Sequence, residues 1–365
     1  MTMSHVKTFV RGLLATTQAI VARMQGRSLK RVLILVGETS PGSAADLRAI
    51  SYVPHLRTHG WHGLVAHPSL TLAWRRALIA LYRPHALYMQ KTRHPLNRPQ
   101  LFPDLPTVID VDDADMVDPA RTAVEIDCYR RAAGLIAGND HLAQRFTDFN
   151  DKVDLIWTST YLPPTPRRHT QATSGKRIIA WGAGDPAGYP QEAELIRSVT
   201  KALSRRFDIE LWIFGARPAS PGFKALVEAY GEEKDVIRFI PHMPYADFVN
   251  ELALVDVGLN PVCLENDYNS GKSFGKLLAY MLAGVPVVTT NCLDYPKFFK
   301  HLHSAVLVDN TVDEWVKAIT QLIADDVLRL SLATNAQHDM TRQLHTAVAT
   351  KLTAHALNRC LQNTH

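Results

Sequence analysis

Short apolar runs alternate with longer mixed segments through most of the chain, and this alternation constrains the fold more than any other feature. In the first half the runs lie at 31–36, 63–66, 86–90, 107–111, 133–137 and 153–157. Strands that are apolar on both sides belong to parallel sheets whose two faces are covered by helices. The first half is therefore predicted to form a doubly wound α/β domain.

The same alternation starts again in the second half of the chain. Its apolar runs lie at 177–181, 209–214, 236–240, 255–259, 285–289 and 305–308. Between the halves, residues 160–176 carry three prolines and no apolar periodicity, which is typical of a linker. We therefore expect two Rossmann-like domains, 31–165 and 166–340, that face each other across a cleft. Such sheets bind ligands at the carboxyl ends of their strands.

The basic charge of the chain is concentrated in an N-terminal arm, residues 1–30. Residues 1–31 contain six Lys and Arg and no acidic residue, whereas the other 34 of the 40 basic residues nearly balance the 35 acidic ones. This distribution argues against a nucleic-acid partner. Apolar residues recur in the arm at near-helical spacing, which predicts a basic amphipathic helix. Such a helix either lies on an anionic membrane or packs on its own domain.

Membrane-spanning segments, disulfides and metal cages are not indicated. No run of about 18 or more apolar residues occurs. The arm shows no small-residue cleavage site, so we do not expect a signal peptide. The cysteines are widely spaced and include no Cys-x-x-Cys pair; they are Cys128, Cys263, Cys292 and Cys360. We expect no metal site and a reduced, cytoplasmic protein.

The most informative local pattern is the stretch NSGKSFGKLLAYMLAGVPVV at 269–288. We expect Gly271 to lie in a loop, and Lys272 and Ser273 to open a helix that ends near Ala283. A helix N-terminus offers free N–H groups, and here also a hydroxyl and an ammonium group, which suit a phosphate or diphosphate. The upstream glycine of a Walker loop is absent. The alternative is an ordinary capped helix with a surface lysine.

Three other strand ends in the second half carry residues suited to a ligand. The run at 178–184 ends in Gly182 and Gly184, where backbone can approach a ligand closely, although tight turns explain most such glycines. Arg217 follows the next strand, and is either near a phosphate or solvated. His242 and Met243 follow the third, where the backbone can face a flat ligand; a lone histidine there is more often structural.

The first half contributes carboxylates and a histidine. The strand at 107–111 holds Asp110 and is followed by Asp112 and Asp113. Such carboxylates suit a metal, acid/base chemistry or sugar hydroxyls, with helix capping as the competing use. His94 follows the strand at 86–90.

These pieces, in this order, resemble the GT-B glycosyltransferases of the bacterial family-four type. The resemblance rests on SAADLRAISYVPHLRTHGW, LYMQKTRHPL, TVIDVDDADM, GLIAGNDHLAQRF and RIIAWGAG, and above all on YADFVNELALVDVGLNPVCLENDYNSGKSFGKLLAYMLAGVPVVTTN. It implies two Rossmann-like domains facing across a cleft. The second would bind a nucleotide-activated sugar and the first an acceptor. A final helix, 341–365, would return to the first domain.

The resemblance also implies residue roles. Lys272 and Ser273 match the group that stabilises the leaving diphosphate without a metal. Gly182 and Gly184 match the glycine loop near the donor phosphates. The family's arginine after that loop is missing here, and Arg217 is the expected substitute.

A pair of glutamates that is usual in the family is absent from this chain. The glutamate that usually holds the donor's ribose hydroxyls is replaced by Ala279, and its partner falls on Gly271. Tyr280, the tyrosine that follows, is retained and is expected at the donor site. Glu265, in the preceding loop, is the candidate to replace one glutamate.

We therefore expect a retaining, metal-independent glycosyltransferase with no cofactor. It would move a sugar from a nucleoside diphosphate to a hydroxyl of a glycan or lipid-linked acceptor, in polysaccharide biosynthesis. Asp112, Asp113 or His94 would orient the acceptor, and the basic arm would hold the protein on the inner face of the plasma membrane. The alternatives are a catalytically degenerate nucleotide-sugar-binding partner protein and a sugar-nucleotide epimerase of the same fold. A dehydrogenase is disfavoured, because no Gly-x-Gly-x-x-Gly follows the first strand.

Overall fold

The computed structural model of the chain describes residues 3–164 and 175–362. The chain divides into two compact units. The first comprises Met1–Tyr161, Ser270–Ser273 and Leu344–His365, and the second comprises Leu162–Asn269 and Phe274–Gln343. The middle of the predicted linker, residues 165–174, lies outside the described residues.

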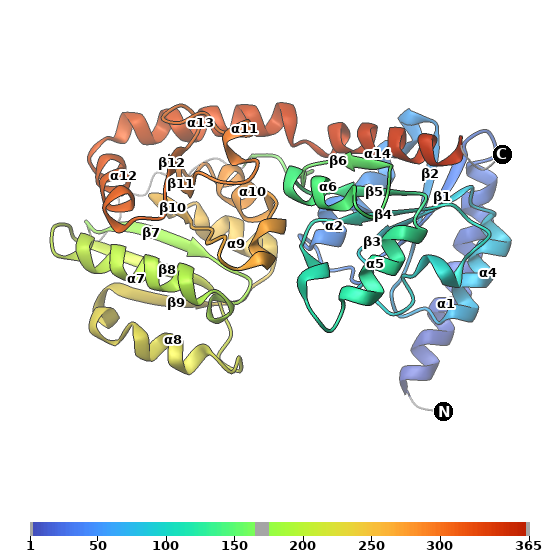
Figure 1. Cartoon of the computed structure of the whole chain (residues 1–365), viewed down its shortest axis with the longest axis horizontal. Coiled ribbons are helices and arrows are strands. Elements are labelled where there is room, and N and C mark those ends of the chain that lie inside the picture. The colour runs from blue at the N-terminus through green and yellow to red at the C-terminus, as the bar shows by residue number, and fades with distance from the viewer. Residues whose placement is uncertain (1–2, 165–174, 363–365) are drawn as a thin grey trace. The chain divides into compact units, whose positions relative to one another are not determined.

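The first unit is built on a parallel six-stranded sheet in the order β2-β1-β3-β4-β5-β6 (Figure 1). Its elements are α1 (Met3–Gln25), β1 (Lys30–Leu35), α2 (Ala44–Arg48), η1 (Ile50–Tyr52), α3 (Val53–Leu56), η2 (Arg57–His59), β2 (Trp61–Ala66), α4 (Leu72–Tyr82), β3 (Ala86–Gln90), η3 (Pro99–Leu101), β4 (Thr107–Val111), η4 (Asp115–Val117), α5 (Thr122–Arg131), β5 (Gly134–Ala137), α6 (Asp140–Phe146), β6 (Val153–Leu155) and α14 (Thr346–Leu361).

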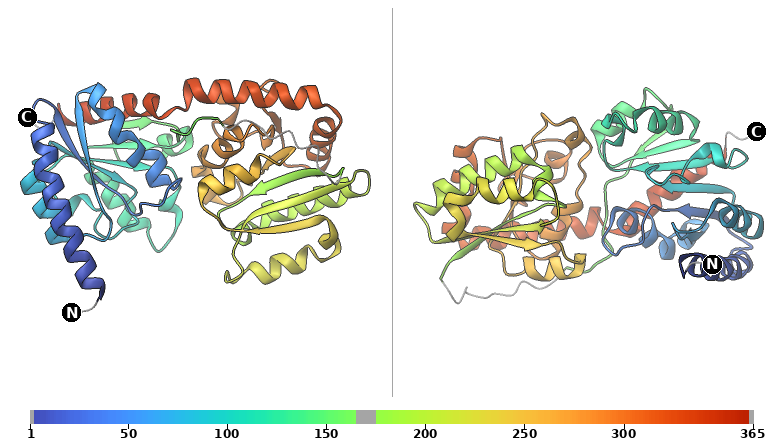
Figure 2. Two further views of the ribbon diagram at one scale, coloured as in Figure 1. Left: turned by 180° about the vertical axis from the view of Figure 1, so that it is seen from behind. Right: turned by 90° about the horizontal axis from the view of Figure 1, so that it is seen from below.

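Both faces of this sheet are buried, as continuous apolar strands require. Along β1, Leu33 and Leu35 enter a core that includes side chains of α4, α5 and α6. Val32 and Ile34 point to the opposite face and pack with α14. Figure 2 shows α14 lying along this sheet.

The second unit is built on another parallel six-stranded sheet, in the order β12-β11-β10-β7-β8-β9. Its elements are β7 (Arg177–Gly182), η5 (Pro186–Gly188), α7 (Pro190–Ser204), β8 (Ile209–Ala216), α8 (Phe223–Ala229), η6 (Gly231–Val236), β9 (Ile237–Pro241), α9 (Tyr245–Leu252), β10 (Val257–Asn260), α10 (Gly275–Leu282), β11 (Val287–Thr290), α11 (Tyr295–Phe298), β12 (Val306–Val308), α12 (Val312–Ala324) and α13 (Asp326–Gln343). The 3-10 segment η7 (Asp267–Gly271) precedes α10.

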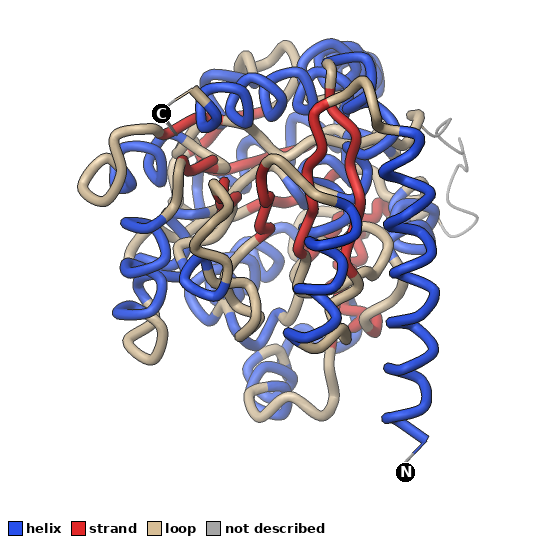
Figure 3. The backbone as a smooth tube through the Cα atoms, turned by 90° about the vertical axis from the view of Figure 1, so that its right-hand side faces the viewer, coloured by secondary structure: helices blue, strands red, loops and turns tan. Residues whose placement is uncertain are grey.

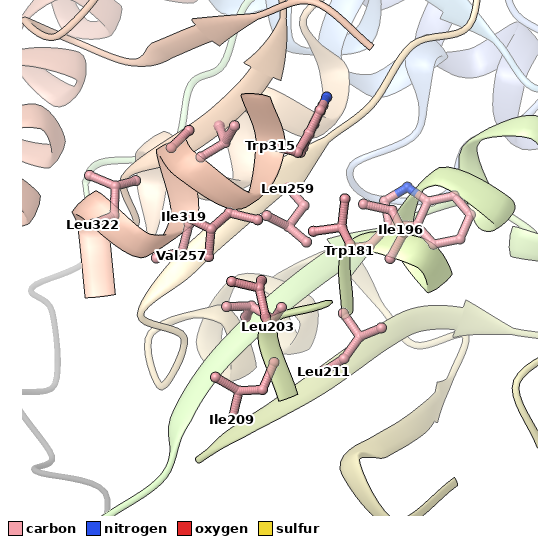
Figure 4. Packing of buried hydrophobic residues seen from close by; sticks show 14 of the residues in the cluster. Trp181, Ile196, Leu203, Ile209, Leu211, Val257, Leu259, Trp315, Ile319 and Leu322 are labelled. Carbon is pink, nitrogen blue, oxygen red and sulfur yellow. The ribbon is translucent and has the colours of Figure 1, made fainter. Parts of the chain in front are cut away.

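One face of the second sheet is covered by α7 and α12. Ile196 and Leu203 of α7, with Trp315 and Ile319 of α12, pack on Leu211 and its neighbours in the strands (Figure 4). On the other face α10 packs on β10. Each strand predicted from an apolar run overlaps a strand of one of the two sheets, so the predicted pair of Rossmann-like folds is confirmed.

The chain ends in two helices, α13 and α14, and the expected final helix of 341–365 corresponds to α14. Between them His345 adopts an extended conformation, and its ring nitrogen accepts from the Ala347 N–H to cap α14. Thr160 pairs with the chain here, donating its N–H to the Leu344 carbonyl at 2.8 Å. This pairing fixes the break, and the chain from Leu344 onward belongs to the first unit.

The N-terminal arm forms the long helix α1 (Figure 3), which packs on α4. A Cβ atom on Gly12 would lie 2.2 Å from the Trp74 ring, so the ring occupies the space of that missing side chain. Ala19 and Ala22 are buried in the same core. The large apolar residues of α1 are each about half exposed; they are Phe9, Val10, Leu13, Leu14, Ile20, Val21 and Met24. Among the described residues no helix is long and apolar enough to cross a membrane.

Candidate functional site

The strand orders locate the ligand-binding edge of each sheet. In a doubly wound sheet, ligands bind at the carboxyl ends of two neighbouring strands whose connections leave in opposite directions. This point lies between β1 and β3 in the first unit and between β7 and β10 in the second. The loops that follow these strands contain His94, Gly184, Glu265 and residues 271–273, whereas the other candidates lie at neighbouring strand ends, in β7 or in α10.

In the first unit, the carboxylates after β4 are held by cations. Lys91 Nζ lies 2.9 Å from Asp112 Oδ1 and 2.5 Å from Asp113 Oδ2. Arg93 pairs with Asp113 at 2.7 Å and with Asp115 at 2.5 Å. Lys91 itself adopts a left-handed conformation, with φ of 59°. We call Asp112, Asp113, Lys91 and Arg93 the charged cluster.

The pKa values show what this cluster can do. Burial raises the pKa of Asp113, but Lys91, Arg93 and Lys272 together lower it well below its usual range. Burial lowers the pKa of Lys91, and Asp112 and Asp113 outweigh this effect and raise it. Asp113 therefore stays ionised near neutral pH and is a poor general base, because an efficient base has a pKa near the working pH.

Asp110 is committed to the interior of the first unit. Its carboxylate forms a fully buried pair with Arg48, with Nε–Oδ2 at 3.0 Å and Nη2–Oδ1 at 2.5 Å. Arg48 Nη1 also donates to Thr158 Oγ1 at 3.0 Å. This arrangement joins α2, β4 and the segment after β6. Asp110 therefore has a structural role in the interior of the first unit.

His94 follows β3 at the predicted edge and is half-buried. Its Nδ1 accepts from the Leu96 N–H at 3.1 Å and lies 3.5 Å from an Arg75 nitrogen. Burial lowers the pKa of His94, and the positive charge of Arg75 lowers it further. His94 is therefore neutral near pH 7 and able to hydrogen-bond a hydroxyl.

The structure corrects the sequence interpretation of Lys272 and Ser273. They do not open a helix: α10 begins at Gly275, after Phe274 in the N-cap position. Residues 270–273, which we call the docked segment, belong to the first unit. Asn139 donates its two side-chain amide hydrogens to the carbonyls of Ser270 and Lys272, both at 2.9 Å.

The docked segment is fixed at two further points. Ser273 Oγ lies 2.7 Å from Thr158 Oγ1 and accepts from the Thr158 N–H at 3.3 Å. Gly271 contacts the backbone of Asp113 and Ala114, and a Cβ atom on it would fall 2.2 Å from the Ala114 nitrogen. Gly271, expected at the donor site, therefore occupies a position where a glutamate does not fit. Lys272 lies near enough to Asp113 to lower its pKa.

In the second unit, Tyr280 supports the glycine loop after β7. Its ring is fully buried, and its hydroxyl accepts from the Gly182 N–H at 2.8 Å and lies 3.1 Å from the Ala180 carbonyl. A Cβ atom on Gly258 would lie 2.6 Å from the same ring. Tyr280 therefore joins the ends of β7 and β10 rather than reaching a ligand, and the Gly182 N–H is already bonded.

The remaining donor-site candidates lie at neighbouring strand ends. Arg217 is exposed, and its Nε donates to the Gly184 carbonyl at 3.0 Å. A Cβ atom on Gly184 would meet open space. The His242 N–H donates to the Ala216 carbonyl, its side chain is exposed, and Met243 beside it is half-buried.

Glu265 lies in the loop after β10 and is exposed. Lys276, which the sequence reasoning did not select, is in the first turn of α10 with its ammonium 5.3 Å from the Tyr189 ring. Asn139, Thr158 and Lys91 were also missed as site residues. Each lies at or just beyond the end of a strand, and this position in the sequence could have identified them.

Within the described part of the chain, no group of three or more His, Cys, Asp or Glu residues is placed to hold a metal ion.

Comparisons with known proteins agree with this arrangement. Residues 185–325 match the family described as glycosyl transferases group 1. Similar solved structures include sucrose-phosphate synthase from Thermosynechococcus elongatus (13% identity, 92% of this chain and 100% of that chain, TM-score 0.69). Anabaena HepE in complex with UDP-glucose is also similar, with 14% identity over 90% of this chain and 99% of that chain and a TM-score of 0.65. WaaG, a glycosyltransferase involved in lipopolysaccharide biosynthesis, has 13% identity over 88% of this chain and 98% of that chain and a TM-score of 0.62. No curated protein shows a significant sequence match.

The fold is that of the GT-B glycosyltransferases, and residues 185–325 match the glycosyl transferases group 1 family within it. Apart from residues 270–273, the group 1 segment lies in the second unit, and it includes the loops after β8, β9 and β10. The resemblance inferred from the sequence is thereby confirmed.

Proposed function

We propose that the protein transfers a sugar from a nucleoside diphosphate to a hydroxyl of a glycan or lipid-linked acceptor, in polysaccharide biosynthesis at the cytoplasmic face of a membrane. The observation that carries this proposal is the group 1 match at 185–325, which spans the loops at the ligand-binding edge of the second sheet. A relative with the same fold, HepE, was solved with UDP-glucose.

The proposed donor site is the carboxyl edge of the second sheet. The glycine loop at Gly184 leaves room for a diphosphate, with Arg217 bonded to that loop as a nearby cation. The backbone at His242 and Met243, after β9, would face the base. Glu265 would contact hydroxyls of the donor, and Gly182 and Tyr280 would act by shaping the loop.

In the proposed reaction, the acceptor oxygen forms a bond to the anomeric carbon while the bond from that carbon to the diphosphate breaks. The acceptor proton passes to an oxygen of the departing nucleoside diphosphate, so the products are the glycoside and the protonated diphosphate. Lys272 and Ser273 would stabilise the developing negative charge without a metal, and the configuration would be retained. Asp112 and His94 would orient the acceptor hydroxyl. Asp113 would act indirectly, by positioning Lys91 and Arg93, because its carboxylate forms ion pairs with both.

A second candidate function is nucleotide-sugar binding without transfer. It is favoured by one observation, the loss of both glutamates at positions where the structure leaves little room to replace them. Gly271 contacts backbone directly, and Ala279 is fully buried.

The test is a thermal-shift screen of the purified protein against UDP-, GDP-, ADP-, dTDP- and CMP-sugars, with and without magnesium. A ligand at 100 times its Kd stabilises a protein by about 2.7 kcal/mol, which moves the midpoint by several degrees. We expect one selective shift that needs no metal, followed by sugar transfer or slow hydrolysis of that donor. Binding without any turnover would favour the degenerate partner, and an altered nucleotide sugar without an acceptor would favour an epimerase.

We also propose that α1 attaches the protein to an anionic membrane. Its exposed apolar residues, with Lys7 and Arg11 among the basic residues of the arm, combine the two properties of an interfacial helix. The helix packs on α4 at Gly12 and Phe9, which both contact Trp74, so the other large apolar residues are left for another surface.

A further inference from the structure

The loop that follows β10 is closed at its base by one buried carboxylate. Glu192 Oε1 accepts from the backbone N–H of Cys263 at 3.1 Å and from the side-chain amide of Asn269 at 2.7 Å. The same Asn269 nitrogen donates to the Cys263 carbonyl at 2.7 Å. Glu192 is 4% exposed and Asn269 is fully buried. We call the residues between these anchors, Cys263–Asn269, the closed loop.

The chemistry of the three groups fixes the orientation of the Asn269 amide. Its nitrogen faces two acceptors, the Glu192 carboxylate and the Cys263 carbonyl, so the amide cannot be reversed without placing oxygen against oxygen. Among the described residues its Oδ1 has no hydrogen-bond donor. The loop base thus has one defined arrangement, and it depends on Glu192 as the acceptor.

The closed loop lies at the ligand-binding edge of the second sheet. Glu192 is in the first turn of α7, which follows β7, whereas Cys263 follows β10. These are the two neighbouring strands at which the chain reverses its direction of winding. Glu192 therefore joins the two loops that border the expected ligand.

The start of the closed loop is held just as firmly. The Val262 N–H donates to Thr290 Oγ1 at 2.9 Å, and Asn310 donates to the Val262 carbonyl at 2.8 Å. In contrast, the middle of the loop is exposed at Leu264, Glu265 and Asp267. A loop with a rigid base and an exposed acidic tip is suited to present carboxylates to a ligand's hydroxyl groups.

We propose that Glu192 is a positioning residue for sugar transfer, which holds the closed loop so that its acidic tip meets the sugar of the donor. Glu192 does not contact the donor; it acts through Cys263 and Asn269. This inference rests on the proposed function. It predicts that Glu192 matters for the nucleotide sugar and much less for the nucleoside diphosphate alone.

The experiment compares Glu192→Ala with Glu192→Gln and with a control, Glu194→Ala. The side-chain amide introduced by Glu192→Gln keeps an oxygen that can accept both bonds. Glu194 lies on the same helix, is exposed and bonds only along that helix, to Arg197 and Ser198 among the contacts found for it. We expect Glu192→Ala to raise the KM for UDP-glucose at least tenfold, with the Kd for UDP changed less than threefold. Glu192→Gln should recover most of the loss, and Glu194→Ala should behave as wild type.

A second measurement does not depend on activity. Hydrogen exchange of the peptide 263–269 should be faster in Glu192→Ala than in Glu194→Ala, because the loop base has opened. Unchanged exchange and unchanged KM in Glu192→Ala overturn the inference, as does equal loss of UDP and UDP-glucose binding. A wild-type protein that turns over no nucleotide sugar, with faster exchange in Glu192→Ala, overturns the proposed function and leaves only the loop closure. If Glu192→Ala fails to fold, Asn269→Asp, which sets two carboxylates together, should show the same KM defect, reversed by adding Glu192→Gln.

Discussion

Gly271 lies so close to Ala114 that a Cβ atom on residue 271 would fall 2.2 Å from the Ala114 nitrogen. The two residues are far apart in sequence, yet both belong to the first unit. In the sequence, Gly271 stands where related proteins usually carry a glutamate, and this looks like the loss of a ligand-binding group. The contact gives another reason for the glycine, because only hydrogen fits between residue 271 and this backbone.

The first prediction concerns that contact. Gly271→Ala should destabilise the protein by about 1–3 kcal/mol, the usual cost of forcing extra atoms into a packed site. Gly271→Glu should cost at least as much and should not raise activity. Urea unfolding measures the difference. Gly231→Ala is the matched control, because a Cβ atom there meets open space. A stable Gly271→Glu protein with higher activity would contradict this prediction and identify the glycine as a lost ligand.

The second prediction concerns Asn139, which holds the docked segment from the other side. Its amide nitrogen donates to the Ser270 and Lys272 carbonyls, and its oxygen caps α6 by accepting from the Leu142 N–H at 2.8 Å. Asn139→Ala should lose about 2–4 kcal/mol of unfolding free energy, since it removes a helix cap and the side-chain donor to two carbonyls. Asn139→Asp keeps the cap but sets a carboxylate oxygen against the two carbonyls, so its loss should be at least as large in the same urea experiment. Equal stability of all three proteins would show that the segment is not held by this side chain.

These two residues show which parts of the molecule could be read from the sequence. The strands were predictable because each is a continuous apolar run such as 177–181, and a run of this kind has few alternatives to a buried strand. The docked segment was not predictable, because its partners lie more than a hundred positions away; Asn139 and Ser270 are separated by 131. A helix beginning at Lys272 was the natural local interpretation of Gly-Lys-Ser, but Asn139 engages the Ser270 and Lys272 carbonyls and the helix begins later.

Some features of the candidate site could likewise be predicted from the sequence, and others could not. That polar residues such as Asp112 and His94 follow strands could be recognised, because strand ends are visible in the sequence. Which of them remain available for a ligand depended on long-range pairing. Asp110 proved to be engaged by Arg48, and Tyr280 by the backbone of two strands. Glu192 was missed because it lies in the first turn of a helix, and its two partners lie beyond β10.

The third prediction uses the lowered pKa of Asp113. Its pKa in the unfolded chain is about 3.9, and in the folded protein it is lower. The stabilisation by this carboxylate is therefore fully present above about pH 5 and is lost as the pH falls below about 4 toward the folded pKa. Asp113→Asn should cost about 1.5–3 kcal/mol at pH 7, the usual range for hydrogen bonds to a charged group. The gap in urea midpoint between wild type and Asp113→Asn should shrink from pH 7 to pH 3, and a constant gap would refute the assignment.

The fourth prediction separates the two lysines near the start of α10. Lys272→Ala should lower kcat by roughly 100-fold with little change in donor KM, if Lys272 stabilises charge that develops only in the transition state. Lys276→Ala is the comparison, because Lys276 lies in the first turn of α10 beside Tyr189 and belongs to the second unit. Its loss should appear mainly in donor KM. Steady-state kinetics with the donor found in the thermal-shift screen measure kcat and donor KM for both variants. A normal kcat in Lys272→Ala would show that Lys272 is not the residue that stabilises the transition state.

The last prediction tests the membrane role of α1. Leu13 and Leu14 are 49% and 60% exposed, so replacing both by Glu leaves the packing of Gly12 on Trp74 intact. Each leucine buried in the membrane contributes about 1.5–3 kcal/mol of binding free energy, and each Lys or Arg near an anionic surface about 1 kcal/mol.

We expect wild-type protein to co-sediment with vesicles containing phosphatidylserine and to bind less in high salt or to neutral vesicles. The double variant should bind at least 100-fold more weakly. Val327→Glu combined with Leu330→Glu is the control, because it places the same two charges on apolar side chains of α13 that are 79% and 50% exposed. Since α1 packs on α4 at Gly12 and Phe9, binding that survives the double variant would show that some other surface meets the membrane, and no binding by wild type would leave α1 as a purely structural helix.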